Sequence, residues 1–123
     1  MGDTGEEEVR QDVLVYLAGP ISPTKYASTE THIARALDTF LQLTQAGVPS
    51  FLPHAAAAFP SAHKIHYDVW MAYDDAFLRR CTHVLMLPGW TTSKGAMLEF
   101  GRAKDRGVPI VHSVEALFRL LGM

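Results

Sequence analysis

Residues 13–20, which read Val-Leu-Val-Tyr-Leu-Ala-Gly-Pro, decide the fold of this chain. An apolar run with no polar face is typical of a strand buried in a parallel sheet, and the Gly-Pro pair ends it. The pattern returns at residues 83–87, His-Val-Leu-Met-Leu, before Pro88 and Gly89. Residues 48–52, interrupted by Pro49, and residues 108–112 predict two more strands.

Helical patterns separate these strands. Apolar residues spaced three and four apart predict a first helix from Ser28 to Gly47, a second over residues 69–78, a third over about 94–106 and a closing helix over 114–121. Residues 54–64, with an alanine run and Pro60, are predicted to form a loop. The apolar positions of the first helix are Ile33, Leu37, Phe40 and Leu41, and those of the second are Val69, Trp70, Tyr73, Phe77 and Leu78.

Strands that alternate with helices imply parallel βαβ units with right-handed crossovers. The sequence therefore predicts a flavodoxin-like (Rossmann-like) α/β fold, a three-layer sandwich around a four- or five-stranded parallel sheet. The length of 123 residues suits one domain. We expect a disordered, acidic N-terminal leader over residues 1–11 and a folded domain over residues 12–123.

Composition argues against several classes of function. With 11 basic and 13 acidic residues, the chain has a net charge of −2 and no general attraction for nucleic acid or an anionic membrane. No apolar run approaches the ~18 residues of a membrane span, and the acidic N-terminus is unlike a signal peptide. The single cysteine, Cys81, cannot form an internal disulfide, which fits a reducing compartment. We expect a cytoplasmic protein with small-molecule partners, without nucleic-acid polymer or membrane.

In open parallel sheets, ligands bind beyond the carboxyl ends of the strands. This rule selects the segments Gly19–Tyr26, Pro53–Lys64 and Pro88–Ser93. The third segment leads into a helix for which Thr92 or Ser93 is a natural N-cap, and a helix start binds anions.

Gly95 lets a ligand approach the backbone of that helix, and Glu99 lies one turn deeper on the same face. A carboxylate there could reach a sugar whose phosphate rests on the helix start. The alternative is that Ser93 only caps the helix and Glu99 is a solvated side chain.

Asp74 lies beside the apolar side of the second helix, and Asp75 nearer its far side. Glycosidic chemistry needs two carboxyl groups, one at C1′ and one that protonates the leaving group, so Asp74 and Glu99 are a candidate pair. The alternative is an ordinary acidic surface. Tyr16, near the end of the first strand, is either a core residue or a site residue. His54 follows the second strand at the ligand end.

The motifs resemble those of the nucleoside 2-deoxyribosyltransferase-like superfamily. Its opening strand is similar to Tyr-Leu-Ala-Gly-Pro-Ile-Ser at 16–22, and its second half to Asp-x-x-x-Leu at 74–78, Val-Leu-Met-Leu-Pro-Gly-Trp at 84–90 and Ser-x-Gly-Ala-x-x-Glu at 93–99. Order and spacing also resemble the 2′-deoxynucleoside 5′-monophosphate N-hydrolases and cytidylate N-glycosidases. The resemblance covers residues 13–112.

The resemblance implies catalytic roles for three residues. Glu99 matches the nucleophilic glutamate that attacks C1′, Asp74 matches the aspartate that assists departure of the base, and Tyr16 matches the tyrosine beside the sugar. The implied activity is an N-glycosidase that cleaves the base–sugar bond of a nucleoside 5′-monophosphate or nucleoside. Neither a metal nor an organic cofactor is implied. The pair His63 and His66 has no third ligand with convincing spacing.

The resemblance also implies binding roles. Ser93 and Gly95 match a phosphate-binding turn, His54 a histidine near the base, and Gly19 and Ile21 the pocket wall. Some relatives carry an arginine in the first loop where this chain has Ser22, with Lys25 or Lys94 as substitutes outside the motif.

Three functions therefore remain open: hydrolysis, transfer of the sugar to another base, and nucleotide binding without turnover. The resemblance also implies a homodimer in which a neighbour helps to close the pocket. We expect the second helix, including Trp70, near the dimer interface.

Overall fold

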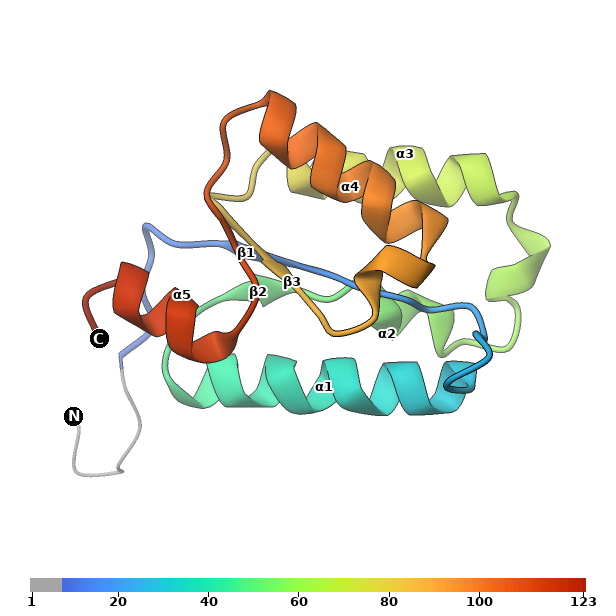
Figure 1. The fold of residues 1–123 in the computed structure, drawn as a ribbon, viewed down its shortest axis with the longest axis horizontal. Coiled ribbons are helices and arrows are strands. Elements are labelled where there is room, and N and C mark those ends of the chain that lie inside the picture. The colour runs from blue at the N-terminus through green and yellow to red at the C-terminus, as the bar shows by residue number, and fades with distance from the viewer. Residues whose placement is uncertain (1–7) are drawn as a thin grey trace.

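The computed structural model describes residues 8–123 as one parallel sheet with helices on both faces (Figure 1). The predicted leader lies outside the described residues as far as residue 7. Among residues 8–123, no helix is long and apolar enough to cross a membrane. In chain order the elements are β1 (Val15–Ala18), α1 (Thr29–Gln45), β2 (Ser50–Phe51), α2 (His54–Ala57), η1 (Ala62–Lys64), α3 (Tyr67–Leu78), β3 (His83–Met86), η2 (Trp90–Thr92), α4 (Lys94–Asp105), β4 (Ile110–Val111) and α5 (Val114–Leu120).

The four strands pair in parallel in the order β2-β1-β3-β4. In the centre, Tyr16 of β1 pairs with Phe51 of β2 on one side and with Val84 of β3 on the other. The chain moves outward from β1 to β2 and then returns past β1 to form β3, so the strand order reverses beside β1. The carboxyl ends of β1 and β3 therefore flank the switch point at which such sheets bind ligands.

Alternate residues of β1 face two separate cores. Val15 and Leu17 pack into a cluster with Leu43 of α1 and Leu117 of α5. Tyr16 and Ala18 pack into a second cluster with Leu78 of α3 and with Ala96 and Ala103 of α4. Figure 1 shows α1 and α5 on one face of the sheet and α3 and α4 on the other. The predicted three-layer, flavodoxin-like fold is confirmed.

Two segments differ from the prediction. The strands expected over 48–52 and 108–112 are reduced to β2 and β4, of two residues each. Pro49 has no N–H to donate, although its carbonyl accepts a hydrogen bond from Val15 N at 2.9 Å. Residues 54–64 are not the predicted loop but contain α2 and η1, because the alanine run there favours a helical turn.

The buried faces of two helices are rotated from the predicted ones. Leu37 and Leu41 of α1 are exposed, as are Val69 and Tyr73 of α3. The inward-facing positions combine large apolar side chains with small and polar ones, so apolar periodicity alone does not give the orientation of either helix. The buried residues are His32, Ala36 and Leu43 in α1, and Met71, Asp74, Asp75 and Leu78 in α3.

Candidate active site

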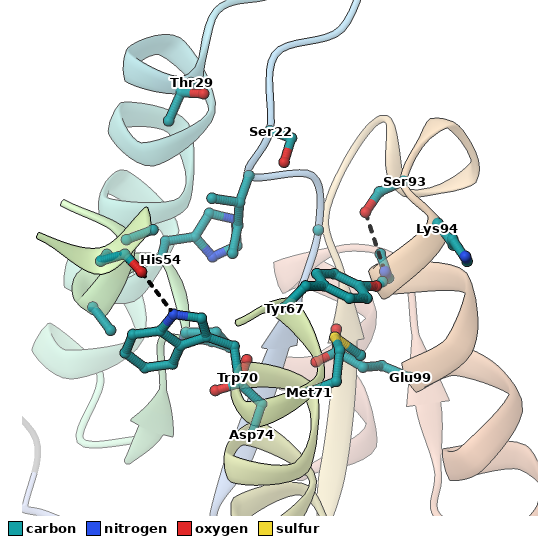
Figure 2. Close-up of a pocket in the computed structure, with 18 of the residues that line it drawn as sticks. Ser22, Thr29, His54, Tyr67, Trp70, Met71, Asp74, Ser93, Lys94 and Glu99 are labelled. Atoms are coloured by element: carbon teal, nitrogen blue, oxygen red, sulfur yellow. Dashed lines mark hydrogen bonds between the residues drawn. The ribbon is translucent and has the colours of Figure 1, made fainter. Parts of the chain in front are cut away.

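A cavity of about 750 Å³ opens at the carboxyl ends of β1 and β3, within the size range of small-molecule sites (Figure 2). All three segments selected from the sequence contribute to its wall, together with α3 and the first turns of α4. Of the residues predicted for the site, the cavity is lined by Gly19, Ile21, His54, Asp74, Ser93, Gly95 and Glu99.

Glu99 is a buried carboxyl group in α4, with 6% of its surface exposed. Its pKa is raised to about 7, chiefly by burial; a hydrogen bond from Tyr16 and the charge of Arg102 oppose this rise, and the nearby Asp74 adds to it. Near neutral pH this carboxyl group therefore passes between a protonated form and an ionised carboxylate. The alternative of a solvated helix residue is wrong for Glu99.

Tyr16 is a core residue that does not line the cavity itself but contacts Glu99, which does. Its side chain is fully buried beside Phe51, with ring centroids 5.5 Å apart, and its hydroxyl donates a hydrogen bond to Oε2 of Glu99. Burial and the neighbouring carboxyl groups raise the pKa of Tyr16 far above its ordinary value, so the phenol stays protonated. It is a permanent donor aimed at Glu99.

Asp74 faces the same cavity from α3. It is 8% exposed, and burial raises its pKa to about 6. A carboxyl group with a raised pKa can hold a proton near neutral pH and release it to a leaving group. Figure 2 shows Asp74 and Glu99 projecting from α3 and α4 into the same region. Two carboxyl groups from different helices therefore meet in one buried site.

The start of α4 has the geometry expected for an anion site. Ser93 is the N-cap, and its Oγ accepts a hydrogen bond from Ala96 N at 3.1 Å. The Ser93 hydroxyl proton remains as a donor at the cavity wall, which Lys94 also lines. A Cβ on Gly95 would lie 3.3 Å from Tyr67 Oη, so Gly95 also permits close contact between α4 and α3.

His54 is held in one orientation at the start of α2. It is 1% exposed, burial lowers its pKa to about 4, and its Nε2 lies 3.1 Å from the carbonyl oxygen of Pro20. A neutral ring bonded to a carbonyl must carry its proton on Nε2, which leaves Nδ1 as a buried acceptor with no hydrogen-bond partner among residues 8–123. His54 therefore ties the first loop to α2 and retains one free acceptor.

Gly19 lines the cavity wall, and the packing of β1 against Leu87 also requires a glycine at this position. A Cβ there would lie 2.7 Å from Cβ of Leu87, so the end of β1 could not approach the end of β3 with any larger residue. Ser22 also lines the cavity, whereas the Lys25 ammonium group lies over the ring of Tyr26, 5.1 Å from its centroid, away from the wall.

Sequence reasoning missed three lining residues of α3, namely Tyr67, Trp70 and Met71. Together with Asp74 they occupy positions i, i+3, i+4 and i+7, which is one face of a helix, so the position of Asp74 could have revealed them. Trp70 donates its indole N–H to the carbonyl oxygen of Ala62 at 3.0 Å, which ties η1 to α3 beside the cavity (Figure 2). The paired histidines take other roles: His63 Nδ1 lies 2.8 Å from Pro60 O, and His66 caps α3.

The chain is a parallel α/β domain in which a buried tyrosine–glutamate pair and an aspartate lie beside one cavity at the switch point of the sheet. The chain belongs to the family described as "Domain of unknown function (DUF4406)", which matches residues 13–112. A conserved protein from Enterococcus faecalis V583 has a similar solved structure, with a TM-score of 0.59 and 22% sequence identity over 81% of this chain. This chain spans 62% of that protein, and the likeness concerns the fold alone. None of the curated proteins matches the chain.

Proposed function

We propose that this protein is an N-glycosidase that cleaves the base–sugar bond of a nucleoside 5′-monophosphate or nucleoside, with Glu99 as nucleophile. The observation that carries the proposal is the buried hydrogen bond from Tyr16 to Glu99 in a cavity that Asp74 also lines. Resemblance of the surrounding motifs to the nucleoside 2-deoxyribosyltransferase-like superfamily supports the same activity.

In the first step, Glu99 attacks C1′ of the sugar as a carboxylate. The new bond from the Glu99 oxygen to C1′ forms as the C1′–N bond breaks, and the electron pair of that bond moves to the base nitrogen. Asp74 donates its proton to the departing base. Tyr16 holds the second oxygen of Glu99, which orients the carboxylate and leaves the other oxygen for attack.

In the second step, water cleaves the glycosyl ester. The carboxylate left on Asp74 takes a proton from water as the water oxygen bonds to C1′, and the Glu99 carboxylate departs. This restores both carboxyl groups and releases the free sugar or sugar phosphate. Every proton transfer is assigned to a side chain or to water, so the mechanism needs neither metal nor organic cofactor.

The wall of the cavity suggests how a nucleotide is oriented. A 5′-phosphate fits the start of α4, where Ser93 provides a hydroxyl donor and the helix dipole favours negative charge. The loop arginine of some relatives is Ser22 here, which also lines the cavity. The opposite side offers the flat face of Trp70 with the small side chains of Ala56 and Ala62, which suits a planar base.

A panel of nucleosides and their 5′-monophosphates, analysed by chromatography for free base, tests the proposal. Free base released without an added acceptor supports hydrolysis. Base exchange that requires an acceptor base would instead assign a nucleoside deoxyribosyltransferase. Saturable binding without either product would assign a nucleotide-binding or sensing module.

A further inference from the structure

The two adjacent aspartates of α3 have opposite surroundings. Asp74 faces the cavity, whereas Asp75 faces α4 and is 9% exposed. Asp75 was expected nearer the far side of the helix, away from its apolar stripe. It is buried there because arginines from α3 and α4 surround its carboxylate.

Three arginines contact Asp75, but only two of them link the helices. Arg106, the C-cap residue of α4, donates from Nη2 to Oδ2 of Asp75 at 3.0 Å, and its Nη1 lies 2.9 Å from Oδ1. Arg102 of α4 places Nη1 at 3.6 Å from Oδ1. Arg79, the C-cap residue of α3 itself, donates from Nε to Oδ2 at 3.0 Å.

The two α4 arginines that bind Asp75 lie on the same face of this helix as Glu99. Glu99, Arg102 and Arg106 follow one another at spacings of three and four residues, so they share one face of α4. That face meets α3 where Asp74 and Asp75 are neighbours. Towards the start of α4, Gly95 lies close to Tyr67 and Met71 of α3. The contact between α3 and α4 is therefore closest at Gly95, near the start of both helices. Towards their ends, Asp75 pairs with Arg102 and Arg106. Asp74 and Glu99 lie between these two contacts.

We propose that Asp75 is a positioning residue that, through Arg106 and Arg102, holds α3 against α4 at the register that brings the carboxyl groups of Asp74 and Glu99 together. This inference rests on the function proposed above. The hydrogen bonds from Arg106 and Arg79 lower the pKa of Asp75 against the opposing effect of burial. We call Asp75 with Arg102 and Arg106 the clamp. Because the pKa of Asp75 is lowered, the clamp stays charged through the pH range in which Asp74 and Glu99 titrate.

Several groups face Glu99 and enter its titration. Tyr16 of β1 and Arg102 of α4 lower its pKa, whereas Asp74 and Asp75 of α3 raise it. The effect of Asp74 on Glu99 depends on the separation of the two carboxyl groups. The change in the pKa of Glu99 on Asp74→Asn therefore measures that separation without any requirement for turnover.

The test compares Arg106→Gln with Arg79→Gln. Each removes one positive hydrogen-bond donor from Asp75, but only Arg106 crosses to α4. Carboxyl ¹³C NMR titration of the full chain should show that Asp74→Asn lowers the pKa of Glu99. The decrease in the pKa of Glu99 caused by Asp74→Asn should be at most half as large in the Arg106→Gln background. In the Arg79→Gln background it should be unchanged. In the cleavage assay, Arg106→Gln should lower kcat at least tenfold with little change in KM, and Arg79→Gln less than twofold.

Arg106→Lys, which keeps the charge, replaces Arg106→Gln if that variant does not fold, and should show the same pattern at smaller amplitude. Equal effects of the Arg79 and Arg106 variants would overturn the proposal. So would a lower melting temperature with unchanged coupling and unchanged turnover per folded molecule. If the parent protein releases no base, the proposed function fails, and the coupling measurement alone decides whether the clamp sets the carboxyl spacing.

Discussion

The hydroxyl of Tyr16 donates a hydrogen bond to Oε2 of Glu99, although the two residues are 83 positions apart in the sequence. The central strand and α4 bring them together, because Tyr16 faces the core that α4 covers. Burial alone makes Glu99 a weak acid, and the phenol partly offsets that effect. The hydrogen bond from Tyr16 therefore favours the ionised form of a carboxyl group whose burial disfavours it.

The first prediction concerns Tyr16→Phe and the pH profile. Under the proposed mechanism Glu99 must be ionised to attack, so with an activated leaving base, which needs no proton from Asp74, kcat/KM should fall as the pH drops below about 7. A poorly activated base also needs a protonated Asp74, whose pKa is about 6, so kcat/KM for such a base should be highest between about pH 6 and 7. Loss of the Tyr16 hydroxyl raises the pKa of Glu99 further, which moves the acidic limb measured with the activated base to higher pH. Tyr67→Phe is the control, since no hydrogen bond joins Tyr67 to Glu99; an unmoved limb in Tyr16→Phe would contradict the argument.

The second prediction concerns Ser93→Ala and phosphate. Loss of a charge-assisted hydrogen bond should raise KM for a nucleoside monophosphate by about 10-fold, equivalent to about 1–2 kcal/mol, with kcat little changed. KM for the matching nucleoside should stay constant. Ser113→Ala is the matched control, because Ser113 Oγ caps α5 through Ala116 N at 3.0 Å and lies outside the cavity wall. Equal losses on both substrates would show that Ser93 acts as a cap and not as a phosphate ligand.

The third prediction concerns assembly. Val69 and Tyr73 of α3 are 55% and 51% exposed, and Met97 and Leu98 of α4 are also exposed, which is a substantial apolar surface for one side of a domain. We expect a homodimer that covers this side, with Trp70 turned inward to the cavity. Light scattering at micromolar concentration should give twice the monomer mass, and Val69→Asp should give a monomer. Val9→Asp, at a residue 59% exposed in the N-terminal segment, should leave the dimer intact. A monomeric parent protein would refute this prediction.

Much of the fold followed from the sequence because strand burial and strand–helix alternation are local patterns. Residues 13–18 and 83–87 are apolar on both faces, and only a central position in a parallel sheet satisfies them. Once the strands are placed, the ends of β1 and β3 must meet. The joint position of Ser93, Gly95 and Glu99 on α4 then follows from helical spacing.

The remainder depended on contacts between distant segments. Asp75 looks like a surface residue until Arg102 and Arg106 are placed beside it, 27 and 31 residues further along the chain. With Asp75 buried, Val69 and Tyr73 on the other side of α3 face outward despite their hydrophobicity. No periodicity within one helix contains the position of the arginines. Tyr67 and Met71 differ in this respect, because helical spacing from Asp74 places them on its face of α3.

The fourth prediction links the pKa of Glu99 to stability. The folded-state pKa of about 7 lies above the ordinary value of 4.5, so the folded protein binds this proton more tightly than the unfolded chain does. The resulting stabilisation is fully present below pH 4.5 and is lost as the pH rises through about 7. Glu99→Gln should therefore leave the free energy of unfolding little changed at pH 4.5 and raise it at pH 8, by at most about 3 kcal/mol. Urea titrations at both pH values measure this, with the exposed Glu115→Gln as control; a gain that is equal at both pH values would refute it.

The last prediction concerns Glu99 as nucleophile. Glutamine keeps the shape of the side chain and can still accept the hydrogen bond of Tyr16, but an amide cannot form the glycosyl ester. Glu99→Gln should lower kcat by about three orders of magnitude or more, roughly 4 kcal/mol in the barrier, with little change in substrate affinity. Asp74→Asn should cost less when the leaving base is already activated, because such a base needs little protonation. A 2′-fluoro substrate with a good leaving group should form a covalent adduct at Glu99, detected by mass spectrometry of peptides from the parent protein and absent from Glu99→Gln. Near-normal turnover by Glu99→Gln would exclude the covalent mechanism with Glu99 as nucleophile, because Asp74 is the one other carboxylate that lines the cavity in the described part of the chain.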